Sequence, residues 1–423
     1  MSLQNCFQRK NSGSWIVMGS LIATLVSCNR IDFSPERLHG VMPPGALEPG
    51  LTERANRGDP GAQYRIATMW MTAEPGKRDY AQALEWYTRA ADAGHAQSQS
   101  ALGRLLVNGF GLAEPDFEAG RRWLELAIEH GDSSAVYNLG MVYERGQGVP
   151  VDLVRAISLF RRAADLGLLN AQNALGRAYE SGMGVEVDLE EALRWYQSAA
   201  EQGFAVAQYT LGDIYQNGKG VERDAAEAVT WFRLAAEQGY PPAQAQLGYM
   251  YAAGDGVPLR YEDAARWSRA AGEQQDPDGC NNLAVLYLKG FGVGQDFEES
   301  LQWYRRAAEY GHAGAQNMLG SVYLTGQGAE KNVAEAERFW NAAAAQNYAP
   351  ALYNLGGMFS RKLSPEMTRE EAEKWLSLAA AQGHQRAEYE LAELRKKPAG
   401  ESESEETAMP ARDRAGTTQR TAS

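Results

Sequence analysis

Histidine is the side chain in this sequence with the widest chemical range, because imidazole can act as a general base or bind a metal. Three of the five histidines, His95, His312 and His384, each precede a recurring leucine by seven residues. The same slot elsewhere holds Phe204 and Tyr240. Because the slot accepts aromatic residues, we interpret it as a packing position in a turn. The sequence contains no H-E-x-x-H or Cys/His ligand spacing.

Acidic pairs, glycine pairs and isolated nucleophiles also have structural explanations. Glu190 and Glu191 follow an expected helix N-cap, where negative charge favours the helix dipole. The G-x-G segments follow a helix, whereas a phosphate-binding loop leads from a strand into one. Ser364 and Cys280 have no base in a recognisable sequence context. We therefore predict that the chain is not an enzyme and needs neither a cofactor nor a metal.

A repeat positions all of these residues. A Leu-Gly pair, or a close variant of it, returns every 36 residues, with one interval of 37. Such periodicity is the signature of a solenoid or another repeat array. The first residues of the pairs, called the marker leucines below, are Ile66, Leu102, Leu139, Leu175, Leu211, Leu247, Leu283, Leu319, Leu355 and Leu391.

Each repeat predicts two helices joined by a glycine-rich turn. In the fourth copy, Ala171, Leu175 and Tyr179 are four apart and share one helix face. Gly182 then interrupts that helix, and Asp188 is a good N-cap for a second one, with Glu191 completing a capping-box pattern. The apolar stripe of this second helix contains Ala192, Trp195, Ala199 and Ala200. Two such short helices bury their large side chains only by stacking on a neighbouring copy.

The repeated pattern A-x-x-x-L-G-x-x-Y-x-x-G-x-G-V, an N-cap Asp, then A-x-x-W-x-x-x-A-A-x-x-G, resembles the Sel1-like repeat, a relative of the tetratricopeptide repeats. The resemblance implies an all-α fold, a right-handed α/α superhelical solenoid of about nine 36-residue helix-turn-helix repeats. We place the solenoid at residues 58–397 and a disordered tail at 398–423. In the sixth copy, the segment WSRAAGEQQDPDG indicates the loss of one residue before the closing turn.

The N-terminus predicts export and lipidation. Arg9 and Lys10 precede an apolar stretch of signal-peptide length, which ends in Leu-Val-Ser-Cys28. This ending resembles the bacterial lipobox, in which the cysteine is lipidated after cleavage; an ordinary signal peptide is the alternative. We place a signal peptide at residues 1–27 and a proline-containing tether at 28–57. By family analogy, Asn29 favours the outer membrane of a bacterial cell envelope, facing the periplasm or the cell surface.

One face of the first helix of each repeat varies from copy to copy. Plotted at 100° per residue, the positions five and two before and two and five after the marker leucine form one stripe opposite the regular face. In the related tetratricopeptide family, the matching face lines a concave groove that binds peptides. The resemblance therefore implies that proteins or peptides bind here, and our candidate residues are Arg104, Tyr137, Arg177, Tyr209, Asp213, Tyr249 and Tyr353.

The sequence thus predicts a non-enzymatic scaffold, tethered to a membrane through lipid on Cys28, that mediates protein–protein interaction. A cell-envelope hydrolase and a secreted host-interacting factor are the alternatives. A hydrolase would need a cluster of catalytic side chains that breaks the repeat pattern, and the sequence has none. The net charge of −13, without a long basic stripe, argues against a nucleic-acid partner.

Overall fold

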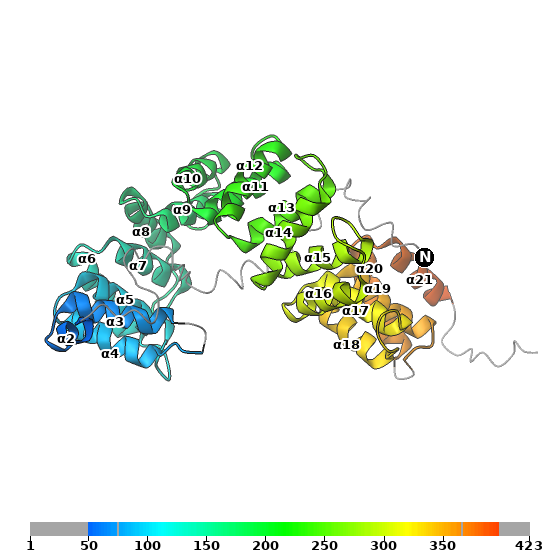
Figure 1. Cartoon of the computed structure of the whole chain (residues 1–423), viewed down its shortest axis with the longest axis horizontal. Coiled ribbons are helices and arrows are strands. Elements are labelled where there is room, and N and C mark those ends of the chain that lie inside the picture. Colours follow the sequence, from blue (N-terminus) through cyan, green and yellow to red (C-terminus); the bar gives the residue numbers. More distant parts are fainter. Residues whose placement is uncertain (1–49, 74–75, 365–366, 397–423) are drawn as a thin grey trace, which may run out of the picture. The chain divides into compact units, whose positions relative to one another are not determined.

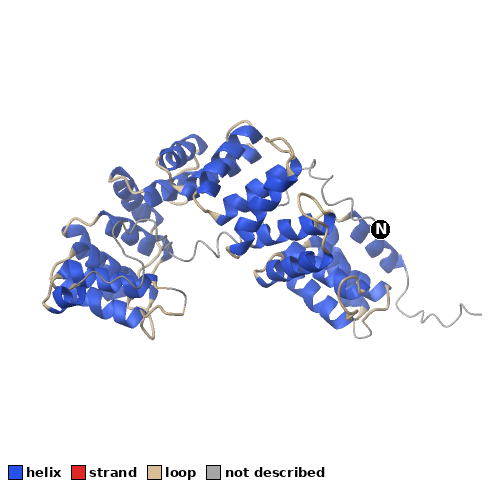
Figure 2. Cartoon of the chain, viewed as in Figure 1, coloured by secondary structure: helices blue, strands red, loops and turns tan. Residues whose placement is uncertain are grey.

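The computed structural model describes residues 50–73, 76–364 and 367–396, which form helices and no strands (Figures 1 and 2). The predicted signal peptide, Cys28 with its predicted lipidation, and the predicted tail at 398–423 lie outside these residues. The helices are α2 Leu51–Asn56, α3 Pro60–Thr72, α4 Tyr80–Asp92, α5 Ala96–Asn108, α6 Phe117–Glu129, α7 Ser133–Arg145, α8 Leu153–Asp165, α9 Leu169–Ser181, α10 Leu189–Glu201, α11 Ala205–Asn217, α12 Ala225–Glu237, α13 Pro241–Ala253, α14 Tyr261–Glu273, α15 Pro277–Lys289, α16 Phe297–Glu309, α17 Ala313–Thr325, α18 Val333–Ala344, α19 Ala349–Ser360, α20 Arg369–Ala381 and α21 Gln385–Lys396.

The predicted all-α repeat architecture is confirmed, with nine helical hairpins running from α3–α4 to α19–α20. We call the first helix of each hairpin its A helix and the second its B helix, and number the repeats 1 to 9. The A helix α21 follows repeat 9. The chain divides after Tyr310 into two compact units, the first containing repeats 1 to 7 and the second repeats 8 and 9 with α21.

The start of the ordered structure differs from the prediction. Residues 51–56, assigned to the tether from their place after a proline-containing segment, form the short helix α2. Leu51 and Ala55 are buried against Ala62 and Ile66 of α3. Gln63 also donates a hydrogen bond from Nε2 to the Ala55 carbonyl at 3.0 Å. The helix α2 therefore covers the first A helix in the manner of a shortened B helix.

The N-caps of the B helices follow from the recurring aspartate. Asp188 accepts a hydrogen bond from the Glu191 backbone N–H at 2.9 Å, which satisfies an otherwise unpaired donor of the first turn. A capping box would also have the Glu191 carboxylate accept a hydrogen bond from the Asp188 backbone N–H. Instead, this carboxylate accepts from Trp195 Nε1 at 3.0 Å.

The glycine after each marker leucine gives the B helix room to approach. A Cβ atom placed on Gly176 would lie 2.6 Å from the ring of Tyr196, and one on Gly212 would lie 2.6 Å from the ring of Phe232. Both rings are almost fully buried. The hairpin core therefore uses the residue after the predicted tryptophan position, whereas Trp195 itself is only half-buried.

The tryptophan position instead joins successive repeats. Trp86 of repeat 1 packs against the cluster formed by α2 and α3. Trp303 of repeat 7 reaches back to repeat 6, where a Cβ on Gly272 would meet its ring at 3.0 Å. Large rings thus fill the space between one B helix and the last turn of the preceding one.

The predicted loss of a residue in repeat 6 is wrong. Its B helix α14 ends at Glu273 and the next A helix begins at Pro277, the same spacing as between α12 and α13. The position that Gly239 occupies with φ 86° is filled by Gln275 with φ 69°. The sequence appeared one residue short because the closing glycine is replaced.

Candidate protein-binding face

The variable stripe comprises the A-helix positions five and two before and two and five after the marker leucine. In repeats 1 to 3 much of it is buried. Thr68, Ser100 and Met141 are 2%, 5% and 6% exposed, and the Thr68 hydroxyl lies 2.9 Å from the hydroxyl of Tyr87. Neighbouring A helices also touch here, because Asn138 donates to the Ser100 hydroxyl at 3.4 Å. This part of the stripe belongs largely to the core.

The stripe is more accessible in repeats 4 and 5. Arg177 of α9 forms an ion pair with Glu144 of α7 at 3.2 Å, and 38% of the Arg177 side chain is exposed. Asp213 of α11 is 37% exposed and accepts from Lys219 Nζ at 2.8 Å. Arg177 and Asp213 are thus charged, hydrogen-bonded and partly exposed, whereas Asn173 of the same stripe has a buried Oδ1 atom without a hydrogen-bond partner among the described residues.

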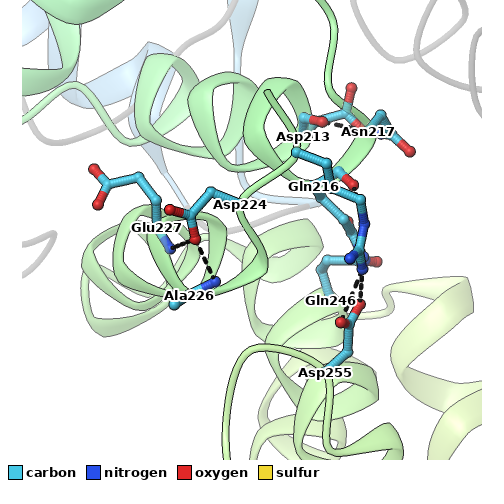
Figure 3. Close-up of polar contacts among 9 residues, drawn as sticks. Asp213, Gln216, Asn217, Asp224, Ala226, Glu227, Gln246 and Asp255 are labelled. Atoms are coloured by element: carbon cyan, nitrogen blue, oxygen red, sulfur yellow. Dashed lines mark hydrogen bonds and ion pairs between the residues drawn. The ribbon is translucent and has the colours of Figure 1, made fainter. Parts of the chain in front are cut away.

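A polar cluster surrounds Asp213 (Figure 3). Asn217 donates to the Asp213 carboxylate at 2.7 Å. Gln246 of α13 donates to Gln216 of α11 at 2.6 Å, linking the A helices of repeats 5 and 6. Each charged group on this part of the stripe has a partner that fixes its position, as required of a preorganised binding surface.

The same two repeats are joined at the loop edge. Arg223 donates two hydrogen bonds of 2.8 Å to Asp255, and Asp224 caps α12 by accepting from Ala226 and Glu227. Both bonds of the Arg223–Asp255 pair come from the arginine Nη2 atom, which contacts the two carboxylate oxygens. This pair holds consecutive turns in register and lies off the variable stripe.

The candidate tyrosines lie at the boundary between the stripe and the core. The Tyr137 ring centroid lies 5.4 Å from that of Phe160, and the Tyr209 centroid lies 5.5 Å from Phe232 and 5.6 Å from Tyr240. Burial raises the pKa of Tyr209 above its ordinary value. These two rings, which belong to the stripe, are half-buried and therefore have a packing role.

The remaining candidates do not form one cluster. Arg104 lies near Tyr64 and Tyr87, and burial lowers the pKa of its guanidinium. Tyr249 is half-buried on α13. Tyr353 belongs to the second unit, where its ring stacks on His384 with centroids 4.6 Å apart. The structure brings together Arg177 and Asp213 with the polar residues of repeats 3 to 6, whereas Tyr353 is in the other unit.

The histidine slot has a role that the sequence analysis missed. The Nδ1 atoms of His95, His312 and His384 accept hydrogen bonds from the backbone N–H groups of Ser98, Ala315 and Ala387 at 3.2, 2.9 and 3.2 Å. The residues are thus N-caps of A helices. The signal was present in the sequence, because the same slot holds Asp59, Asp132 and Asp276, which are ordinary N-cap residues.

A series of buried glutamines was also missed. Gln208, three residues before its marker leucine, donates from Nε2 to the Ala200 carbonyl of the preceding B helix at 3.0 Å. Its Oε1 atom accepts from Gln238 at the end of its own B helix at 2.7 Å. One side chain therefore joins three helices. The Gln172–Gln202, Gln244–Gln274 and Gln316–Gln346 pairs repeat the second bond at 3.1, 2.8 and 2.9 Å.

A second surface feature lies on the loop edge. Val151 and Val154 are 59% and 71% exposed, and a groove beside them is lined by Arg121, Tyr143 and Arg155. The guanidinium of Arg155 lies 4.2 Å from the centre of the Tyr143 ring. This edge is formed by the turns and the starts of B helices and is separate from the variable stripe.

Two features are absent from the residues that the structure describes. No three His, Cys, Asp or Glu side chains there are arranged to hold a metal ion. Within the same residues, no helix has the length and apolarity needed to span a bilayer.

Comparison with protein families gives a match along most of the chain. The family model described as "Sel1 repeat" matches nine consecutive segments. They are residues 60–95, 96–132, 133–168, 169–204, 205–240, 241–276, 277–312, 313–348 and 349–384, so the single 37-residue copy is repeat 2.

Two solved structures resemble the chain over most of its length. The protective antigen c5321 of uropathogenic Escherichia coli is 32% identical, with a TM-score of 0.58, and the match covers 81% of this chain and 73% of that one. A Sel1 repeat protein from Oxalobacter formigenes is 33% identical, with a TM-score of 0.54, and the match covers 74% and 90%.

Curated relatives match over shorter stretches. The "ERAD-associated E3 ubiquitin-protein ligase component HRD3B" of Arabidopsis thaliana is 33% identical over 107 residues, which cover 25% of this chain and 17% of that protein. An uncharacterized protein of Neisseria meningitidis serogroup B is 30% identical over 129 residues, covering 30% and 26%. The matched stretch thus spans about a quarter or less of these relatives.

Proposed function

Because the chain belongs to the Sel1 repeat family, we propose that it is a non-enzymatic scaffold that binds another protein along the variable stripe of repeats 4 to 6. We further propose that lipid on Cys28 holds it at the membrane of a bacterial cell envelope. The single observation that supports the binding role most is the change in the stripe along the first unit. Much of it is buried in repeats 1 to 3, and it becomes polar and more accessible at Arg177 and Asp213. In repeat 6 it is buried again at Ala245 and Ala252, while Tyr249 stays half-buried.

The chemistry of this region suits a protein partner. Arg177, Glu144 and Asp213 provide charged groups that are already oriented by neighbours, so binding costs little side-chain entropy. Farther along the same stripe, Tyr249 and Val285 are half-buried and offer apolar contact area. An accessible surface that combines polar groups with aromatic and aliphatic side chains is typical of a non-obligate interface.

The names of the relatives agree with this proposal at a coarse level. HRD3B is named as a component of a ubiquitin-ligase assembly, and a mouse relative, "DAP3-binding cell death enhancer 1", is named for binding another protein. The mouse protein is 33% identical over 87 residues, 20% of this chain. From these relatives we extend to this chain only one general property, association with other proteins.

Site-specific photocrosslinking tests the stripe. A crosslinking amino acid at Asp213 or Tyr249 is expected to capture one discrete protein in intact cells. The matched control is Glu201, which is exposed on the B helix α10. Equal capture from Glu201 would contradict a specific face, and capture from Val154 instead of Asp213 would move the interface to the loop edge.

Membrane tethering needs a separate test. The protein is expected to incorporate radiolabelled palmitate and to sediment with membranes. A Cys28→Ala variant is expected to lose the label, and Cys6→Ala, which changes a cysteine within the predicted signal peptide, serves as the control. Retention of the label in Cys28→Ala would refute lipidation at this position without affecting the binding proposal.

A further inference from the structure

Three A helices start with a histidine whose hydrogen bond depends on protonation. His95, His312 and His384 cap α5, α17 and α21 through Nδ1. An Nδ1 that accepts a backbone N–H carries a lone pair, so the proton of the neutral ring is then on Nε2. At His95 the Ser98 hydroxyl also lies 2.9 Å from Nδ1 and can donate to the same lone pair. A protonated imidazole has no acceptor nitrogen and cannot make this bond.

The same position in other repeats provides an internal reference. Asp59 accepts from Gly61 and Ala62 at 3.0 and 3.2 Å, and Asp132 and Asp276 accept from the third residue of their helices at 2.8 Å. An ordinary carboxylate keeps its acceptor oxygens until the pH approaches about 4, whereas an ordinary imidazole loses its acceptor near pH 6.5. Burial raises the pKa of Asp132, so Asp276 is the better reference. The chain therefore contains two versions of one cap that differ in the pH at which they fail.

Burial favours the neutral form at two of these positions. Burial lowers the pKa of His95, although the carboxylates of Asp132 and Asp59 oppose the shift, and the Tyr64 ring lies 5.2 Å from the imidazole. Burial also lowers the pKa of His384, assisted by Arg386 and opposed by Glu388 and Glu390.

The surroundings of His312 and His384 complete the comparison. The His384 ring stacks on Tyr353. His312 lies across Gly314 from the Tyr348 hydroxyl. A positive charge at any of the three positions would also oppose the positive end of the helix dipole.

We propose that His95, His312 and His384 together form an acid-sensitive switch that loosens the starts of α5, α17 and α21 in mildly acidic solution. The sign follows from the lowered pKa of His95 and His384 in the folded chain. The unfolded chain binds the proton more readily, so their stabilisation is fully present above about pH 6.5 and is lost as the pH falls through the folded pKa. The helix capped by Asp276 is expected to be unaffected over this interval, because an ordinary carboxylate stays ionised there.

The switch also touches the variable stripe. Tyr64 and Tyr353, two before their marker leucines, lie against His95 and His384 of the following repeats. Loosening of a cap would free one side of each tyrosine ring. The proposal itself rests only on the caps and is independent of any binding partner.

Hydrogen exchange of the full chain at pH 7.5 and 5.5, corrected for intrinsic rates, tests the switch. Protection of the first-turn amides of α5, α17 and α21 is expected to fall about five- to tenfold at the lower pH. The amides at the start of α15, capped by Asp276, are expected to stay unchanged. Equal protection at both pH values in all four helices would overturn the proposal.

Two variants separate capping from other effects of histidine. The triple variant His95→Asp/His312→Asp/His384→Asp places the alternative cap of this chain in all three slots, and its protection is expected to be the same at both pH values. The control is His130→Gln, because the protonated ring of His130 can still donate to Gln99 Oε1, 2.7 Å from Nδ1. That variant is expected to behave like the unmodified chain.

A readout that does not require the triple variant is the tautomer of each ring. Nitrogen chemical shifts at pH 7.5 are expected to place the proton of all three imidazoles on Nε2. A predominant Nδ1–H tautomer at these positions would overturn the proposal even if the variant failed to fold.

Discussion

Repeats 1 to 3 and repeats 4 to 5 use the same positions of the A helix in opposite ways. Two residues after the marker leucine, the first group has Thr68 and Met141 in the core, whereas the second has Arg177 and Asp213 at the surface. The hairpins share one length and one pattern of caps. The comparison teaches that the repeat fixes the backbone, whereas the burial of a variable position depends on the neighbouring helices. Arg104, at the same position in repeat 2, is charged and yet sufficiently buried for its pKa to be lowered.

Alanine substitutions two residues after the marker leucine are expected to give the largest difference in the free energy of unfolding between the two regions. Met141→Ala should lower the free energy of unfolding by about 2–4 kcal/mol, because it removes a buried side chain and leaves a cavity. Asp213→Ala should cost about 0.5 kcal/mol or less, because its ion pair is solvent-exposed. Urea unfolding of both variants measures the difference, and equal losses would contradict the comparison.

Substitution of the glycine next to the marker leucine should affect both regions alike. A Cβ atom would lie 2.6 Å from Phe160 in Gly140→Ala and 2.6 Å from Phe232 in Gly212→Ala. We expect each variant to lose about 1–3 kcal/mol, because the ring must move out of a close-packed site. Thermal unfolding checks the prediction. A loss confined to one region would indicate that the hairpins differ in backbone as well as in surface.

The period of the sequence was enough to predict the helices, their aspartate caps and the glycine turns, because these depend on residues close together in the chain. A helical wheel could identify the variable stripe, but it could not predict that Ser100 is buried while Asp213 is exposed. That difference depends on the neighbouring A helix. For the same reason, the wheel favoured Trp195 as the core residue, whereas contact with Gly176 places Tyr196 there.

The glutamine bonds show a further limit of local reasoning. Gln208 and Gln238 are thirty residues apart, and each looks like an ordinary polar residue of a helix. The sequence indicated the pairing only through its repetition, because a glutamine recurs at both positions in several repeats. Gln63 differs because Ala93 occupies the position that corresponds to Gln238, and among the described residues its Oε1 atom has no hydrogen-bond partner.

This difference predicts unequal effects of removing the two glutamines. Gln208→Ala breaks bonds to both Ala200 and Gln238 and should cost about 1–2 kcal/mol. Gln63→Ala breaks only the bond to Ala55 and removes an unsatisfied buried oxygen, so it should cost about 1 kcal/mol or less. Denaturant midpoints of the two variants provide the measurement, and a larger loss for Gln63→Ala would argue against the role of the paired glutamines.

The smallest expected effect tests whether the backbone is the same in regular and irregular repeats. Gln275 adopts φ 69° where Gly239 adopts φ 86°, and a side chain in this left-handed region is strained. Gln275→Gly should therefore stabilise the chain by about 1 kcal/mol, less the entropy that glycine adds to the unfolded state. The reciprocal change Gly239→Gln should destabilise it by a similar amount. A Cβ atom at Gly239 would meet nothing within 4 Å, so the expected loss of stability in Gly239→Gln comes from the backbone angle and not from a steric clash. Opposite shifts of the two melting temperatures would show that one turn geometry serves both repeats, and destabilisation by both changes would show that Gln275 has a contact of its own to lose.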